Sequence, residues 1–453
     1  MGDGQIGART EGRLNIAVIG SGIAGLSAAW LLARHHDVTL FESDQRLGGH
    51  SHTVDAAGMP VDTGFIVYNE FTYPNLSALF NYLDVDTQGA PMSFAVSLDA
   101  GALEYCGSGI RGLLAQPANA LRPRFWRMML DLLRFYRSAP GDCAAMAEAG
   151  EDLSLGNYLD RQGYSSAFRD DHLLPMAAAI WSTPAAEVGR YPAAAFVRFC
   201  QTHGLLQLRD RPFWRTVAGG SRQYVQRLAA AIPKKIMGTP IRAVRRLGDT
   251  VEVLDGGRTV RRFDHVVIAT HADQALALLG DASAEERRLL GAFRYNRNEA
   301  VLHGDARLMP RRRRVWSSWN YLSRTQLGER KLSVTYWMNR LQQLPESRAL
   351  FVTLNPFHEP HEASVIRRDV YEHPLFDAAA MSAQRQLWSL QGLRNTWFCG
   401  AYFGAGFHED GLQAGLAVAE ELGGVRRPWV VAQESGRISL PVRPSIRTPT
   451  RVA

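Results

Sequence analysis

A glycine-rich turn near the start of the chain constrains the fold more than any other feature. An apolar run over residues 14–19 leads into Gly20, Gly22 and Gly25, which form a G-x-G-x-x-G pattern. A helical stretch and a second apolar run, ending at Phe41, follow directly. A strand, a glycine-rich turn, a helix and a strand within about 30 residues predict a βαβ unit. We therefore expect an α/β fold.

The acidic residue that follows this turn indicates a dinucleotide site. Glu42 ends the second strand 22 residues after Gly20, where dinucleotide-binding folds place the acid that binds a ribose. Gly20 permits the tight turn, Gly22 lets the backbone approach a pyrophosphate, and Gly25 lets helix and strand pack closely. Glycines that only tighten a turn are the alternative, but the neighbouring strand, helix and acid favour a dinucleotide.

Composition narrows the class of protein. The chain has 453 residues, of which 46% are hydrophobic, enough for two or three folded domains and too many for a disordered chain. Charged, Gly or Pro residues interrupt each apolar run before the roughly 20 residues that a membrane span needs. Residues 1–13 lack the apolar core of a secretory signal. We expect a cytoplasmic protein, with peripheral contact to the inner membrane face if its substrate is a lipid.

Cysteine spacing and charge argue against two other classes of protein. The four cysteines contain no C-x-x-C pair, so we expect buried thiols and neither a zinc site nor another metal site. The net charge of +7 is modest for this length. No nucleic-acid-binding module accompanies it, and we expect no nucleic-acid partner.

Five later motifs extend the pattern over residues 14–423. They are E-x5-G-G from Glu42 to Gly49, V-D-T-G-F at 61–65, Gly219-Gly220-Ser221 before a helix, D-H-V-V-I-A-T at 264–270, and G-A-G-F-H-E-D-G-L-Q-A-G at 404–415. Together they resemble the flavin enzymes of the amine oxidase, phytoene desaturase and protoporphyrinogen oxidase superfamily. The resemblance implies noncovalently bound FAD.

It also implies a Rossmann-like FAD-binding domain of the amine oxidase type with an inserted α+β substrate domain. The FAD-binding domain would comprise 14–70, 215–285 and 391–425. The substrate domain would comprise 71–214 and 286–390, and residues 1–13 and 429–453 would be flexible termini.

The FAD contacts follow from the matched motifs and from the expectation that helix N-termini face anionic groups. They are Gly20, Gly22, Ile23, Ala24, Gly25, Glu42, Ser43, Gly48, Gly49, His50, Ser51, Thr63, Gly64, Phe65, Ile66, Ile241, Thr270, Gly400, His408, Asp410, Gly411 and Leu412. His50 departs from the family, since amine oxidases usually carry an arginine after the glycine pair. It is our candidate for an equivalent contact to the phosphates or the flavin, with a purely structural hydrogen bond as the alternative.

The catalytic residues are less constrained, because the flavin itself accepts the hydride. The segment 300–305 resembles the amine oxidase strand whose lysine holds a water, yet it contains no lysine. His303 or Asp305 would take over the water or base role, and a structural role is the alternative for each. The absent lysine weakens the prediction of amine oxidation. Asn320 and Tyr336 are further candidates, with strand packing as the alternative.

The blocks around Asn320 and Tyr336 resemble one bacterial branch of predicted NAD/FAD-binding proteins. The branch often occurs beside cyclopropane-fatty-acid-synthase-like methyltransferases and includes the desaturase of the furan fatty acid pathway. This resemblance implies an FAD-dependent desaturase that takes a hydride from a methyl-branched acyl chain, on a lipid or fatty acyl substrate, with such a methyltransferase as partner. A fatty acid double-bond isomerase, an amine oxidase and a nonenzymatic flavin-binding partner stay open.

A basic, aromatic-rich segment at 122–137 adds an independent indication of a lipid. At 100° per residue, Arg124, Arg127, Asp131, Arg134 and Arg137 fall on one stripe of a helix, and apolar residues cover the rest. Such a helix suits an anionic membrane surface. A buried helix with a solvated charged stripe is the alternative.

Overall fold

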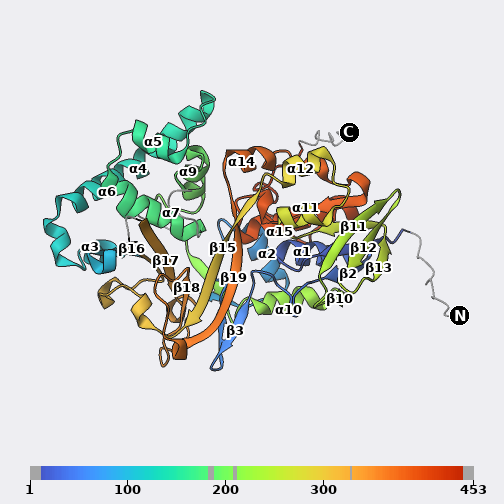
Figure 1. Cartoon of the computed structure of the whole chain (residues 1–453), viewed down its shortest axis with the longest axis horizontal. Helices are drawn as coiled ribbons and strands as arrows, with labels where there is room; N and C mark the ends of the chain where they lie inside the picture. Colours follow the sequence, from blue (N-terminus) through green and yellow to red (C-terminus); the bar gives the residue numbers. More distant parts are fainter. Residues whose placement is uncertain (1–11, 182–187, 208–211, 327–328, 442–453) are drawn as a thin grey trace, which may run out of the picture.

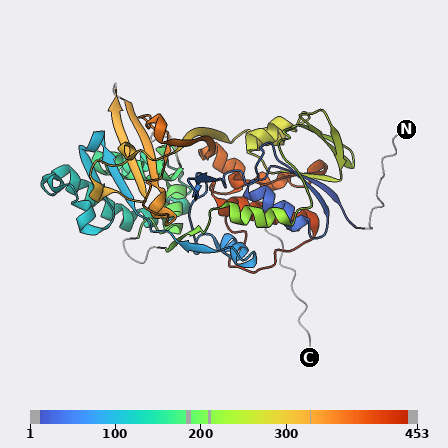
Figure 2. The same ribbon diagram turned by 90° about the horizontal axis from the view of Figure 1, so that it is seen from below.

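The computed structural model describes residues 12–181, 188–207, 212–326 and 329–441. Two lobes lie side by side along the longest axis of the molecule (Figures 1 and 2). The long strands β15 (Arg294–His303) and β19 (Val365–Leu375) run between them. Among the described residues, no helix combines the length and apolar character needed to cross a membrane.

A parallel five-stranded sheet forms the centre of the first lobe, in the order β10-β2-β1-β14-β20. Its strands come from distant parts of the chain: β1 (Asn15–Ile19), β2 (Asp37–Phe41), β10 (Lys234–Ile236), β14 (His265–Ile268) and β20 (Thr396–Phe398). Four of these strands are mostly apolar and buried, as expected when helices cover both faces of a parallel sheet. The predicted Rossmann-like α/β fold is confirmed.

Three helices pack around this sheet, namely α1 (Ile23–Leu32), α10 (Arg222–Ala230) and α15 (His408–Gly423). The close approach of α1 and α15 depends on a glycine, because a Cβ at Gly415 would lie 2.2 Å from the Ala24 carbonyl oxygen. An antiparallel sheet of β11 (Ile241–Leu247), β12 (Thr250–Asp255) and β13 (Val260–Phe263) lies beyond, with α11 (Ala272–Leu278) and α12 (Ala284–Leu290) nearby.

A seven-stranded sheet forms the second lobe, in the order β19-β15-β18-β17-β16-β7-β8. Its remaining strands are β7 (Phe94–Leu98), β8 (Leu103–Cys106), β16 (Trp319–Gln326), β17 (Glu329–Trp337) and β18 (Phe351–Leu354). A helical layer lies against it, comprising α3 (Gly109–Leu113), α4 (Pro123–Glu148), α5 (Leu155–Arg161), α6 (Ser166–Phe168), α7 (Leu174–Trp181) and α9 (Ala193–Thr202).

Several short elements complete the fold. They are the hairpin β3 (Thr53–Ala56) and β4 (Met59–Asp62), the three-stranded sheet of β5 (Tyr68–Asn69), β9 (Trp214–Val217) and β6 (Thr87–Gly89), and the helices α2 (Pro74–Tyr82), α13 (Met338–Leu341) and α14 (Ala378–Gln384).

The arginines of the charged stripe on α4 are solvated, since the side chains of Arg124, Arg127 and Arg134 are 54%, 60% and 42% exposed. Arg127 and Arg134 also pair with the buried Asp131, and Arg124 pairs with Asp171. One sequence-based expectation needs correction. The segment expected to be flexible from residue 429 onward is ordered in part. Arg437 pairs with Asp410 at 2.7 Å, and Ile438 is buried. The error arises because Asp410, 27 residues earlier in the sequence, pairs with Arg437. Residues 1–11 and 442–453 lie outside the described residues.

Candidate functional site

The glycine-rich turn leaves room for an anionic group. Gly20 has φ +100°, and a Cβ there would lie 2.8 Å from the Ala269 carbonyl oxygen. A Cβ at Gly25 would lie 1.9 Å from the Gly20 carbonyl oxygen, whereas one at Gly22 would meet nothing within 4 Å. No side chain caps the N-terminus of α1, so the first-turn N–H groups, including those of Ile23 and Ala24, are free of such a bond. Open space beside a helix N-terminus fits a pyrophosphate.

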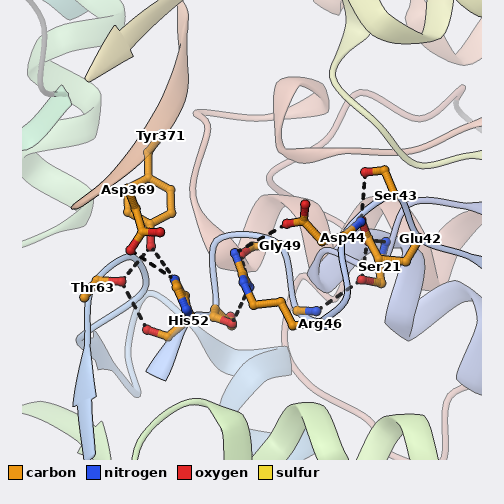
Figure 3. A network of polar contacts seen from close by, with 12 residues as sticks. Ser21, Glu42, Ser43, Asp44, Arg46, Gly49, His52, Thr63, Asp369 and Tyr371 are labelled. Atoms are coloured by element: carbon orange, nitrogen blue, oxygen red, sulfur yellow. Dashed lines mark hydrogen bonds and ion pairs between the residues drawn. The ribbon is translucent and has the colours of Figure 1, made fainter. Parts of the chain in front are cut away.

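Glu42 is fixed beside this turn (Figure 3). Its carboxylate accepts hydrogen bonds from the backbone N–H groups of Ser21 and Asp44, both at 2.9 Å, and from the Ser43 hydroxyl at 3.1 Å. The Ser21 hydroxyl donates to the same carboxylate and accepts from the N–H of Gly48 at 3.1 Å. Glu42 retains exposed surface, so its carboxylate is oriented and still has surface open to a ribose.

The glycine pair after Glu42 brings the next loop close to the turn. A Cβ at Gly49 would lie 3.0 Å from the Cα of Gly22, and one at Gly64 would lie 2.0 Å from the His50 carbonyl oxygen. The N–H of Phe65 donates to that oxygen at 2.8 Å. The predicted contacts on both loops therefore lie next to the phosphate turn.

Asp62 holds these loops to α10 and α13. Its buried carboxylate accepts from the backbone N–H of Ser221 at 2.9 Å, from the Thr53 hydroxyl at 2.6 Å, and from the Gln342 amide at 3.0 Å. Burial raises the pKa of Asp62 to about 6, although these donors oppose the shift.

The N-terminus of α15 brings His408 to the same loops. Its ring stacks on Phe65 with centroids 3.8 Å apart, and its Nε2 lies 2.7 Å from the Tyr224 hydroxyl and 3.0 Å from that of Ser51. Burial lowers the pKa of His408 to about 3, so the ring is uncharged at neutral pH. The first turn of α15 therefore presents an uncharged imidazole and backbone N–H groups.

Three predicted cofactor residues on α15 already contact protein. Asp410 accepts from the Phe407 N–H at 2.8 Å and pairs with Arg437, while Leu412 is fully buried in the core. Gly411 packs on α1, since a Cβ there would lie 3.0 Å from the Ile23 side chain. We infer that these three residues stabilise the N-terminus of α15.

Four remaining predicted contacts lie around these loops. Ile241 begins β11 and is partly buried, Ile66 is buried, and the Thr270 hydroxyl donates to the His271 carbonyl oxygen at 3.1 Å. A Cβ at Gly400 would lie 2.5 Å from the Tyr402 ring.

His50 is surrounded by three rings from two separate segments. Its centroid lies 5.2 Å from that of Tyr371, 5.6 Å from that of His373 and 6.0 Å from that of His271. The Nε2 atom of His50 is buried and has no hydrogen-bond partner among the described residues. Burial, and then repulsion by His373 and His271, lowers its pKa well below the usual value. His50 is therefore a neutral imidazole with one unpartnered nitrogen.

The partners of His50 are fixed by contacts of their own. His271 stacks on Tyr295 with centroids 4.4 Å apart, and Asn298 donates to Nδ1 of His373 at 3.0 Å. Burial lowers the pKa of His373 to about 4. The hydroxyls of Tyr371 and Thr63 share a hydrogen bond of 2.6 Å (Figure 3).

Sequence reasoning missed Tyr371, His373 and His271. Tyr371 and His373 are two residues apart on β19, so their side chains point to the same face of the sheet. His271 directly follows the predicted strand motif 264–270. These two signals could have identified them.

The predicted catalytic residues lie elsewhere. His303 Nε2 is 2.7 Å from the Thr353 hydroxyl and its Nδ1 accepts from the N–H of Asp305 at 3.0 Å. Asp305 pairs with Arg307 and accepts from the His361 N–H, which holds its pKa well below the usual value. His303 ends β15 eight residues after Tyr295, about 26 Å along the strand. The structure gives His303 and Asp305 internal partners and does not bring them to His50.

Asn320 and Tyr336 lie on opposite faces of the sheet. The Asn320 amide donates to the carbonyl oxygens of Ser317 and Thr335, and the Thr335 hydroxyl lies 2.9 Å from that of Thr353. Asn320 thus joins His303 in one buried polar network. Tyr336 instead belongs to the apolar cluster on the other face.

The comparison with protein families decides the class of protein. The family model described as flavin containing amine oxidoreductase matches residues 23–296, more than half of the chain. The chain belongs to the flavin-containing amine oxidoreductase family. This membership agrees with the open turn and the oriented Glu42, and FAD is the cofactor that the site fits. Among the described residues, no group of His, Cys, Asp and Glu could hold a metal ion.

A curated relative of this flavin-containing amine oxidoreductase aligns with part of the chain. A Mycobacterium tuberculosis protein named as a flavin-containing monoamine oxidase, AofH, is 29% identical over 56% of this chain and 57% of its own length. The chain therefore spans just over half the length of the curated relatives it matches.

Two solved structures share the fold. The CLA-producing fatty acid isomerase from P. acnes is 15% identical, with a TM-score of 0.63 over 91% of this chain and 99% of its own. A putrescine oxidase whose cofactor binding was redesigned is 15% identical, with a TM-score of 0.67 over 90% of this chain and 98% of its own. Identities this low show the fold alone.

Proposed function

We propose that the chain is an FAD-dependent oxidoreductase that desaturates a fatty acyl chain, methyl-branched and carried on a phospholipid. Family membership supports the FAD-linked oxidation. The apolar cluster that continues from the flavin-binding loops into the substrate lobe carries the choice of an acyl substrate.

This cluster includes residues on both sides of Gly64 and Phe65, among them Val61 and Ile66. Ile66 and Val67 pack in the same cluster as Tyr371, and the cluster extends through Tyr336 to Phe125 and Met128 on α4. These side chains are already buried, so an acyl chain would gain contact with the partly buried apolar side chains packed against the cluster, such as Met92, Phe94 and Trp214, at about 25 cal/mol per Å² removed from water. The rings nearest His50, those of Tyr371 and His373, carry no charge. The carboxylate of Glu372 is already paired with His271 at 3.5 Å.

FAD, the apolar cluster and His50 would each have a separate role in the reaction. Bound FAD supplies the hydride acceptor. The apolar cluster would hold two neighbouring C–H groups and exclude water. As one carbon loses a hydride, the other loses a proton to Nε2 of His50, and a C=C bond forms between them. The unpartnered Nε2 of His50 supports this role, since no hydrogen bond to protein has to break before it takes the proton.

Amine oxidation is the second candidate function, favoured by the family match. A double-bond isomerase is the third, in which the hydride returns to the acyl chain and no electron acceptor is consumed. Partnership with a cyclopropane-fatty-acid-synthase-like methyltransferase stays a proposal that follows from the acyl substrate.

Mass spectrometry of the lipids of cells with and without the gene tests this proposal. The gene should produce phospholipid acyl chains two mass units lighter than their precursors, because one H₂ is removed. Cells that carry His50→Gln should lose the product, and cells that carry His358→Gln, a change at an exposed histidine, should keep it. Products of unchanged mass would indicate the isomerase. An unchanged lipid profile would contradict an acyl substrate.

A further inference from the structure

The helical end of the substrate lobe exposes a row of large apolar side chains. On α4, Trp126, Leu130 and Leu133 are 47%, 64% and 43% exposed and recur at i, i+4 and i+7. Leu121, just before α4, is 87% exposed, and Ile110 on α3 is 76% exposed. We call these five residues the α3–α4 ridge. Single exposed apolar residues are ordinary, but a contiguous row marks an interaction surface.

The opposite face of α4 packs in the hydrophobic core. Phe125, Met128, Leu132 and Phe135 are buried there, so the helix is apolar on two sides. The outer row adds nothing to the packing of the lobe. The indole N–H of Trp126 donates to the Ala120 carbonyl oxygen at 2.9 Å, which fixes the ring while nearly half of its surface stays exposed.

The charges around the ridge have one sign. Residues 107–141 contain six arginines and a single acidic residue, Asp131. Asp131 is buried and paired with Arg127 and Arg134, so it presents little negative charge to a partner. Arg111 and Arg137 are exposed, and neither forms an ion pair within the part of the chain that the structure describes.

We propose that the α3–α4 ridge docks on the surface of an anionic lipid bilayer. A helix with an apolar row and flanking arginines lies in the headgroup region with its apolar side inserted, and a tryptophan with an anchored N–H suits that boundary. The charge complementarity selects anionic lipid as the occupant. Neutral lipid would leave the arginines without partners.

The position of the α3–α4 ridge relates membrane docking to the proposed acyl substrate. The ridge lies at the end of the molecule away from the parallel sheet of the first lobe (Figure 1). Phe125 and Met128, on the inner face of the same helix, belong to the apolar cluster that includes Tyr371 beside His50. Docking would thus place bilayer and apolar cluster on the two sides of one helix. This extends the proposed acyl oxidation, but vesicle binding needs no turnover and can fail or succeed independently of it.

Cosedimentation of the purified holoprotein with vesicles tests the proposal. Vesicles of equal parts phosphatidylglycerol and phosphatidylcholine should bind the protein at low salt, and vesicles of phosphatidylcholine alone should bind it far less. The variant Trp126→Ser/Leu130→Ser/Leu133→Ser should lose binding. Arg111→Gln/Arg137→Gln should weaken it by about fivefold for each arginine, roughly 25-fold together.

Matched controls lie on the first lobe. Leu247→Ser/Leu393→Ser/Val430→Ser removes three comparably exposed apolar groups, and Arg242→Gln/Arg245→Gln removes two exposed arginines. Both controls should bind like the wild type, and all variants should keep the flavin spectrum. The proposal is overturned if the wild type does not bind anionic vesicles, or if the ridge variant binds as tightly as the wild type. It is also overturned if sedimentation velocity shows a dimer that the ridge variant converts to monomer, because the occupant is then a second copy.

Discussion

The ring of Tyr371 lies 5.2 Å from the ring of His50, centroid to centroid. This pair joins the last strand of the substrate lobe to the loop that follows Glu42, and the Tyr371 hydroxyl also contacts Thr63 and His52. The two lobes therefore meet at the residue whose free nitrogen we assign as proton acceptor. A substrate held against β19 would lie beside His50.

Gly22 and Gly25 should respond differently to the same substitution. Gly22→Ala adds a methyl group to open space, so we expect near-native stability but weak FAD binding, because the methyl group occupies the approach of the pyrophosphate. Gly25→Ala forces its methyl group against the Gly20 backbone and should cost roughly 1 to 3 kcal/mol of unfolding free energy. Urea denaturation of the apoprotein and FAD titration separate the two effects. Equal loss of stability in both variants would contradict the open turn.

Glu42→Ala should weaken FAD retention. Loss of buried hydrogen bonds from a carboxylate to a ribose costs about 1 to 3 kcal/mol, or roughly ten- to hundredfold in the dissociation constant. Isothermal titration of the apoprotein with FAD measures the change. Glu285→Ala, which removes an exposed glutamate from α12, is the control and should bind FAD normally. Unchanged binding in Glu42→Ala would remove Glu42 from the site.

His50 and His303 offer a direct comparison of two candidate bases. His50→Gln should slow flavin reduction by about 10²- to 10⁴-fold, the usual contribution of a general base, with FAD content unchanged. His303→Gln should reduce flavin at nearly the wild-type rate, since His303 contacts Thr353 and the Asp305 backbone instead. Single-turnover absorbance measures both rates. The reverse order would return the base role to the His303 segment.

His303 should also make stability depend on pH. Burial lowers its pKa in the folded protein to about 4, whereas an unfolded histidine titrates near 6.5. Below about pH 6.5 the unfolded chain binds the proton more readily, so stability falls as the pH drops and levels off below about 4. His303 alone would account for up to about 3 kcal/mol of this loss. Unfolding of the apoprotein at successive pH values should show a shallower decline for His303→Gln than for wild type.

The strand, the glycine-rich turn and the helix of the first lobe could be predicted from local pattern, because they are adjacent in the sequence. The turn at Gly20, the helix after it and the acid at Glu42 are adjacent in sequence, and tight backbone approach admits only glycine at 20 and 25. The helix that begins at His408 could also be predicted from local pattern, since its residues are consecutive.

The residues around His50 could not be found in this way. Tyr371, His373 and His271 reach it through the pairing of β15 with β19 and through the crossing from β14 to α11. Likewise Arg124 appears free in sequence, yet Asp171, 47 residues away, pairs with it. Contacts between distant segments decide both features, and one sequence does not specify which segments meet.

Anaerobic bleaching of the flavin tests the central claim most directly, that an acyl chain is the hydride donor. The holoprotein is mixed without oxygen with phospholipid vesicles that carry methyl-branched acyl chains, and separately with a panel of primary amines. We predict that the vesicles bleach the flavin, that the amines do not, and that His50→Gln slows bleaching while retaining FAD. Bleaching by amines, with none by the acyl lipids, would contradict the account.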